Sequence, residues 1–108
     1  MDISEQYEDL TRKINDNLPI KAFPIRELVQ IFRENGHPIT LKTKLTIISV
    51  YNSGDVSGIM CIVESVDGYR MACALTHLIF SRATTFYAEI VDYQKKRNKR
   101  IIQLNLTR

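Results

Sequence analysis

Apolar side chains near the N-terminus recur every three or four residues, which is the period of a helix that packs on one face. The positions of this stripe are Ile3, Tyr7, Leu10, Ile14 and Leu18. Asp2 and Glu5 have the spacing of a helix start in which two side chains satisfy backbone N–H groups. Pro19 ends the helix because proline pushes the preceding residue out of the α region. The pattern predicts a helix over residues 3–17.

A second helix is indicated by signals at both of its ends. Pro24 suits a first-turn position, and Asn35-Gly36 supplies a left-handed stop. Between them, apolar residues repeat at helical spacing at Ile25, Leu28, Val29 and Phe32.

After residue 41 the apolar period changes to two and β-branched residues become frequent, which is typical of strands. We predict strands over residues 44–51, 58–66 and 69–78, joined by a turn at residues 52–55 and a two-residue hairpin at Asp67-Gly68. That hairpin would pair residues whose numbers sum to 135. The numbers of Cys61 and Cys73 sum to 134, so these side chains would face opposite sides of the sheet and could not form a disulfide. Both faces would be largely apolar, so we expect the sheet to be covered on both sides.

Residues 81–99 predict a last helix, with Ser81 as its cap and a cationic final turn. Residues 101–108 alternate weakly and could form either a short fourth strand or a frayed tail. The predicted fold is therefore one α+β domain over residues 1–108. It contains two N-terminal helices, a three-stranded antiparallel meander and a long C-terminal helix.

Composition and chain ends restrict where such a protein works. Apolar runs such as residues 59–63 are far shorter than the roughly 20 residues of a membrane span, so we expect no membrane partner. The N-terminus lacks the basic and apolar regions of a secretory signal. Two cysteines that are twelve positions apart fit reduced thiols, and we expect a cytoplasmic protein.

Charge is strongly segregated along the chain. The net charge is +3, yet residues 95–108 contain six basic residues and no acidic one. A basic run forms the centre of this segment: Lys95, Lys96, Arg97, Lys99 and Arg100. Such a run is a solubilising helix end, a contact for nucleic-acid phosphates or a contact for an acidic partner.

Catalytic chemistry has only weak candidates. Cys73 and His77 could form a nucleophile and base, but four positions on one strand separate them by roughly 13 Å. Glu64 interrupts an apolar strand and would have a raised pKa if it were buried, although a position at the sheet rim beside Arg70 or Lys44 explains it equally. No metal motif is present in the sequence, and we expect no cofactor.

These observations favour a non-catalytic interaction or regulatory module. The partner would be a second copy in a homodimer or another protein, because the N-terminal stripe and an exposed strand edge could pair with another chain. A nucleic-acid-binding protein that uses the basic run is the first alternative. A small enzyme with Glu64 or the Cys73 and His77 pair in its site is the second.

Overall fold

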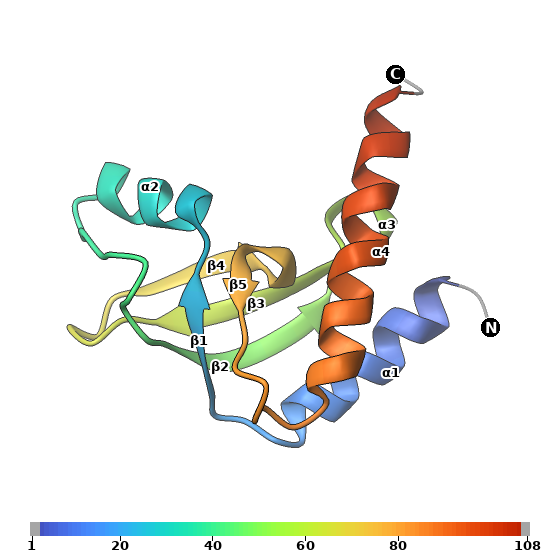
Figure 1. The fold of residues 1–108 in the computed structure, drawn as a ribbon, viewed down its shortest axis with the longest axis horizontal. Helices are drawn as coiled ribbons and strands as arrows, with labels where there is room; N and C mark the ends of the chain where they lie inside the picture. Colours follow the sequence, from blue (N-terminus) through green and yellow to red (C-terminus); the bar gives the residue numbers. More distant parts are fainter. Residues whose placement is uncertain (1–2, 107–108) are drawn as a thin grey trace.

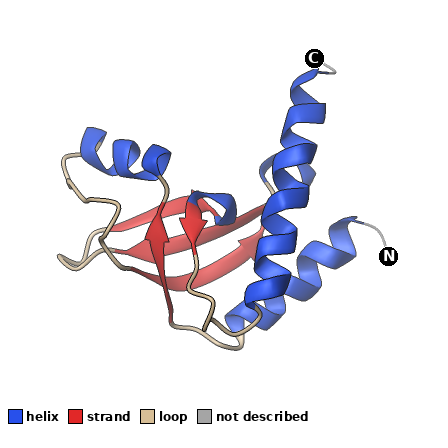
Figure 2. Ribbon diagram, viewed as in Figure 1, coloured by secondary structure: helices blue, strands red, loops and turns tan. Residues whose placement is uncertain are grey.

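Five antiparallel strands form one sheet in the described residues 3–106 of the computed structural model, in the order β4–β3–β2–β1–β5 (Figures 1 and 2). The elements along the chain are α1 Ile3–Asn15, β1 Ile20–Pro24, α2 Arg26–Glu34, β2 Leu45–Asn52, α3 Gly54–Ser57, β3 Ile59–Glu64, β4 Arg70–Ala74, the 3₁₀ helix η1 Leu75–His77, β5 Leu78–Ile79 and α4 Tyr87–Leu106. The predicted α+β class is confirmed, with five strands instead of three.

The sheet bends so that β1 and β5 cross in front of β2, β3 and β4 (Figure 1). Its inner face is closed: Ile59, Cys61 and Val63 of β3 lie in the same buried cluster as Ala22 of β1 and Leu78 of β5. Alternate residues on β3 are only half-buried, so the other face is partly exposed. The expectation of a sheet covered on both sides is wrong, because the bent sheet encloses its own apolar face.

Helix α1 packs Tyr7, Leu10 and Ile14 of its predicted stripe against this core, and all three are buried. The helix ends at Asn15, two residues earlier than predicted, and the cap predicted at Asp2 lies outside the described residues. The Asn15 side chain accepts a hydrogen bond from the Val50 amide (3.1 Å) and donates one to the Val50 carbonyl (2.7 Å). These bonds fix the end of α1 to the middle of β2.

Strand β1 was not predicted, and Pro24 belongs to it and not to α2. The strand pairs with β2 over three residues and with β5 over two. Proline has no N–H to donate to a ladder, and it is tolerated here because Pro24 is the last residue of a short strand. Ile25 is the N-cap of α2, and its amide donates to the His77 carbonyl at 3.0 Å.

The β3–β4 hairpin has a register one residue away from the prediction. The Ser65 amide bonds the Tyr69 carbonyl (2.9 Å), and Gly68 has φ +86°. The loop therefore contains three residues and uses a left-handed glycine. Paired residues sum to 134, and Cys61 lies directly opposite Cys73. The prediction that these two cysteines face opposite sides is wrong; both are buried free thiols.

The C-terminal third also differs from the prediction. Strand β4 ends at Ala74, where the predicted strand over residues 69–78 is interrupted by η1. Ser81 caps a turn, since its hydroxyl accepts from the Ala83 amide. The helix begins only at Tyr87, after Phe86 at φ +62°. It continues to Leu106, so residues 101–106 are neither strand nor frayed tail. No helix among the described residues is long and apolar enough to span a membrane.

Candidate functional site

The basic run lies on α4, and its five residues have different environments. The Arg97 side chain is only 2% exposed, and Arg100 is half-buried. Lys95, Lys96 and Lys99 are exposed. The structure therefore does not bring the five cations together on one accessible surface, because the two arginines turn toward the body of the protein.

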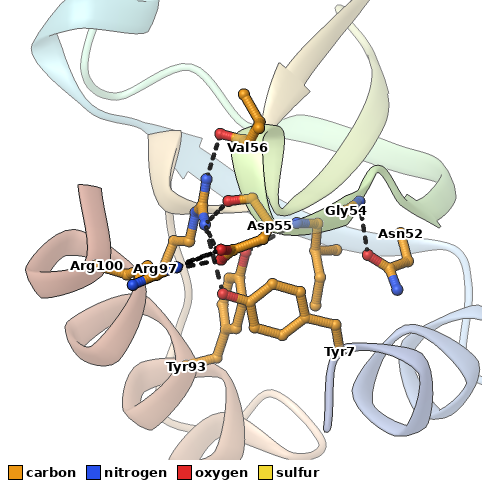
Figure 3. Close-up of polar contacts among 9 residues, drawn as sticks. Tyr7, Asn52, Gly54, Asp55, Val56, Tyr93, Arg97 and Arg100 are labelled. Carbon is orange, nitrogen blue, oxygen red and sulfur yellow. Dashed lines mark hydrogen bonds and ion pairs between the residues drawn. The ribbon is translucent and has the colours of Figure 1, made fainter. Parts of the chain in front are cut away.

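Arg97 holds α4 against the turn between β2 and β3 (Figure 3). Its guanidinium donates to the backbone carbonyls of Asp55 and Val56, each at 2.5 Å, and to the Tyr7 hydroxyl at 3.5 Å. The two carbonyls belong to the four-residue helix α3, whose backbone oxygens attract a cation. A buried arginine with several acceptors is a structural anchor, since an unpaired buried charge is too costly.

Tyr93 and Gly58 complete this anchor. The Tyr93 hydroxyl accepts a hydrogen bond from the Ile59 amide at 2.8 Å, and burial raises the pKa of Tyr93 to about 12. Gly58 has φ +70°, and a Cβ there would lie 2.6 Å from the Tyr93 hydroxyl and 2.7 Å from the Arg97 Nε. Only glycine fits a backbone that approaches two side chains this closely.

Asp55 joins the anchor from α3. Its Oδ2 accepts from Arg100 Nη2 at 2.6 Å and its Oδ1 accepts from Arg100 Nε at 3.2 Å, which is a two-pronged ion pair (Figure 3). The hydrogen bonds from Arg100 hold the pKa of Asp55 below its ordinary value, and the same bonds raise the pKa of Arg100. We call Asp55, Gly58, Tyr93, Arg97 and Arg100 the α4 anchor.

A groove of about 350 Å³ lies between α1 and α4, next to the α4 anchor. We call it the helix groove; its lining is Gln6, Tyr7, Asp9, Leu10, Glu89, Asp92, Tyr93, Lys96 and Arg100. The Tyr7 and Tyr93 rings meet edge to face, with centroids 5.2 Å apart at 81°. Together with Leu10 they form an aromatic and aliphatic floor.

The five charged residues of this lining already have partners. Lys13 bridges Asp9 (3.3 Å) and Glu89 (3.1 Å) across the two helices, and hydrogen bonding to Glu89 is the main cause of its raised pKa. Lys96 pairs with Asp92 at 2.9 Å, and Arg100 pairs with Asp55. The pKa values of Lys13 and Tyr93 are both raised, which moves them further above neutral pH, whereas proton-transfer groups need a pKa near the working pH. The arrangement is suited to binding.

The predicted catalytic residues lie elsewhere and apart from one another. Glu64 sits on β3 and accepts from Arg70 Nε at 2.8 Å, with a third of its side chain exposed. Cys73 is buried on β4, and burial raises the pKa of its thiol to about 12. A protonated thiol is a poor nucleophile.

His77 belongs to η1, beyond the end of β4. Burial lowers the pKa of His77, and its Nδ1 has no hydrogen-bond partner in the described part of the chain. No hydrogen bond joins it to Cys73 among those residues.

Sequence reasoning missed Asp55 and Gly58, which belong to a turn cluster with no chemical motif. Asp55 meets Arg100 across 45 positions of sequence, and no local spacing reports such a contact. The described residues contain no group of three or more His, Cys, Asp or Glu side chains that could hold a metal ion. No protein-family model matches the chain, and neither a curated protein nor a solved structure shows significant similarity to it.

Proposed function

We propose that this protein is a non-catalytic interaction module that binds a helix of a partner protein in the helix groove. The observation that carries the proposal is the exposed junction of α1 and α4, where an apolar floor is framed by charged side chains that already have partners. Specific sites commonly combine an apolar centre with a polar rim. The floor residues Tyr7, Leu10 and Tyr93 are only 6–7% exposed, so affinity would come from a partner side chain that fills the groove, and the rim would give orientation.

The charges of the rim indicate which partner fits. Along α4 the lining residues follow one another as Glu89, Asp92, Lys96 and Arg100, and Lys13 bridges Asp9 to Glu89, so the acidic residues lie toward the start of α4 and the basic ones toward its end. Glu89 and Arg100 are eleven residues apart on α4, a span of about 16 Å along the helix axis. A partner helix with a basic residue at one end, a leucine or phenylalanine in the middle and an acidic residue at the other end complements this order.

The α4 anchor supports this proposal because it makes one wall of the groove rigid. Arg97 and Arg100 fix α4 to α3, and Gln94 donates to the carbonyls of Leu75 (3.0 Å) and Leu78 (2.7 Å). A site that is formed before binding loses less conformational entropy when the partner arrives.

The test is to block the groove and compare a matched change outside it. Gln6→Trp would fill the groove from α1, whereas Asn98→Trp adds the same ring to an exposed position of α4 that does not line it. Tagged protein is purified from its own cells, and co-purifying proteins are quantified by mass spectrometry. We expect Gln6→Trp to lose specific partners that Asn98→Trp retains, with both variants folded by circular dichroism. If Gln6→Trp retains every partner, the proposal is wrong.

Two other expectations have separate readouts. A homodimer would appear as a concentration-dependent mass in sedimentation equilibrium, and blocking the groove would shift it to monomer only if the groove is the dimer contact. The nucleic-acid alternative now rests on the exposed lysines Lys95, Lys96 and Lys99, of which Lys96 also pairs with Asp92, since Arg97 is buried and Arg100 is half-buried in its pair with Asp55. Their change to alanine would abolish salt-sensitive RNA or DNA binding if that alternative holds.

A further inference from the structure

A second groove, of about 340 Å³, lies along α2 and differs from the helix groove in its charges. We call it the α2 groove; its lining is Arg26, Val29, Gln30, Arg33, Thr40 and Leu41. Arg26 and Arg33 are seven positions apart, so they share one face of α2 at a separation of about 10 Å along its axis.

Neither of these arginines has an ion-pair or hydrogen-bond partner among residues 3–106. Arg12, Arg70, Arg97 and Arg100 all pair with a carboxylate. Glu34 follows Arg33 directly, but its carboxylate accepts from the Gln30 amide at 3.3 Å and does not line the groove. The α2 groove therefore has two arginines that make no ion pair or side-chain hydrogen bond within residues 3–106, and the glutamates of α2, Glu27 and Glu34, do not line it.

The space between the arginines is apolar and firmly bounded. Val29 is buried on α2, while Leu41 is 50% exposed on the opposite side of the groove. Hydrogen bonds within residues 40–43 hold this wall: the Thr40 amide bonds the Thr43 hydroxyl (3.0 Å), and the Thr43 amide bonds the Thr40 carbonyl (3.1 Å). Val29 and Leu41 therefore give the groove an apolar centre between the two arginines.

We propose that the α2 groove binds an acidic segment of another protein, with two carboxylates about 10 Å apart and an aliphatic side chain between them. A protein segment fits better than nucleic acid because the lining offers an aliphatic contact and no aromatic ring for base stacking. Two guanidinium groups on one rigid helix match carboxylates in geometry as well as in charge. This surface is separate from the helix groove, so either proposal can fail alone.

The probe is a fluorescent alanine-based helical peptide of about 16 residues, with two glutamates seven positions apart and a leucine midway. Binding to the full chain is measured by fluorescence anisotropy, and its site is mapped by amide chemical-shift changes. We expect a tenfold loss of affinity, about 1.4 kcal/mol, in the double variant Arg26→Ala/Arg33→Ala. Raising the salt concentration from about 50 to about 300 mM should also weaken binding.

The matched control removes two exposed cations elsewhere: Lys95→Ala/Lys99→Ala changes the net charge equally and should leave peptide affinity unchanged. A second control exchanges the charges of the protein and the peptide. The variant Arg26→Glu/Arg33→Glu should bind a peptide that has lysines in place of the two glutamates. Failure of the glutamate peptide to bind the wild-type protein at about 1 mM would overturn the proposal. Equal affinity for the arginine double variant, or shift changes that avoid α2, would also overturn it.

Discussion

The helix groove and the α2 groove have nearly the same volume, about 350 and 340 Å³, but their charged side chains are arranged in opposite ways. Every charged residue that lines the helix groove has an intramolecular partner, and an aromatic floor lies between them. The two arginines of the α2 groove have none among the described residues. Satisfied charges leave binding to apolar burial, whereas uncompensated charges attract an opposite charge. Binding in the helix groove should therefore depend less on salt.

Gly58→Ala is expected to have the largest effect of the changes considered, because it disrupts the α4 anchor and with it the helix groove but not the α2 groove. The new Cβ would overlap Tyr93 and Arg97, and the φ of +70° would be strained. We expect a loss of about 3 kcal/mol in the free energy of unfolding, measured by urea denaturation. The helix groove should be lost, while the fraction that stays folded should bind the acidic peptide normally. If the Gly58→Ala variant is as stable as the wild type, the close contacts of Gly58 with Tyr93 and Arg97 do not contribute to stability as proposed.

Arg97→Met is expected to rank second. Methionine keeps much of the apolar stem but cannot donate to the carbonyls of Asp55 and Val56, so we expect about 2 kcal/mol less stability by the same measurement. Lys99→Met is the control, because its cation is exposed, and it should stay within about 0.5 kcal/mol of wild type. Equal effects of the two changes would contradict the assignment of Arg97 as an anchor.

Acidification should weaken the anchor through Asp55. The pKa of Asp55 is lower in the folded chain than its ordinary 3.8, so its stabilising effect is complete above that value and disappears as pH falls through the folded pKa. Asp55→Asn should lessen the fall in stability below about pH 4, measured by thermal unfolding across pH. Arg100→Gln should lessen it to a similar extent. An unchanged acid slope in both variants would exclude this ion pair as the cause.

The double variant Lys95→Ala/Lys99→Ala should have the smallest effect. Both lysines are exposed and have no ion-pair partner in the described part of α4 or its surroundings, so stability should stay within about 0.5 kcal/mol of wild type. A clear loss of stability would place these lysines in an interaction that the structure does not contain.

The sequence predicted those parts of the molecule that depend on local patterns. The stripe of α1, the stop of α2 at Asn35-Gly36 and the strands β2, β3 and β4 follow from apolar spacing and turn residues. Strands β1 and β5 were not predicted because they are short and their hydrogen-bonded partners are distant in sequence. The register error came from one residue: Ser65-Tyr69 closes a three-residue loop, where Asp67-Gly68 indicated a two-residue turn.

The candidate site was less accessible to sequence reasoning. The basic run was visible, but which of its residues face the protein (Arg97 and Arg100) and which are exposed (the three lysines) depends on which face of α4 meets α3. The pair of arginines on α2 could have been found, since Arg26, Gln30 and Arg33 share the polar face of a predicted helix. What the sequence lacks is the information that no carboxylate reaches them.

The most direct test of the proposed function is site-specific photo-crosslinking in cells that produce the protein. A photoreactive phenylalanine analogue is placed at Lys96, an exposed residue on the rim of the helix groove, or at Asn98, on the face of α4 that does not line the groove. We predict a protein adduct at Lys96 that persists when extracts are crosslinked in high salt, and none at Asn98. An adduct confined to Asn98, and lost in high salt or after nuclease treatment, would contradict the proposed function.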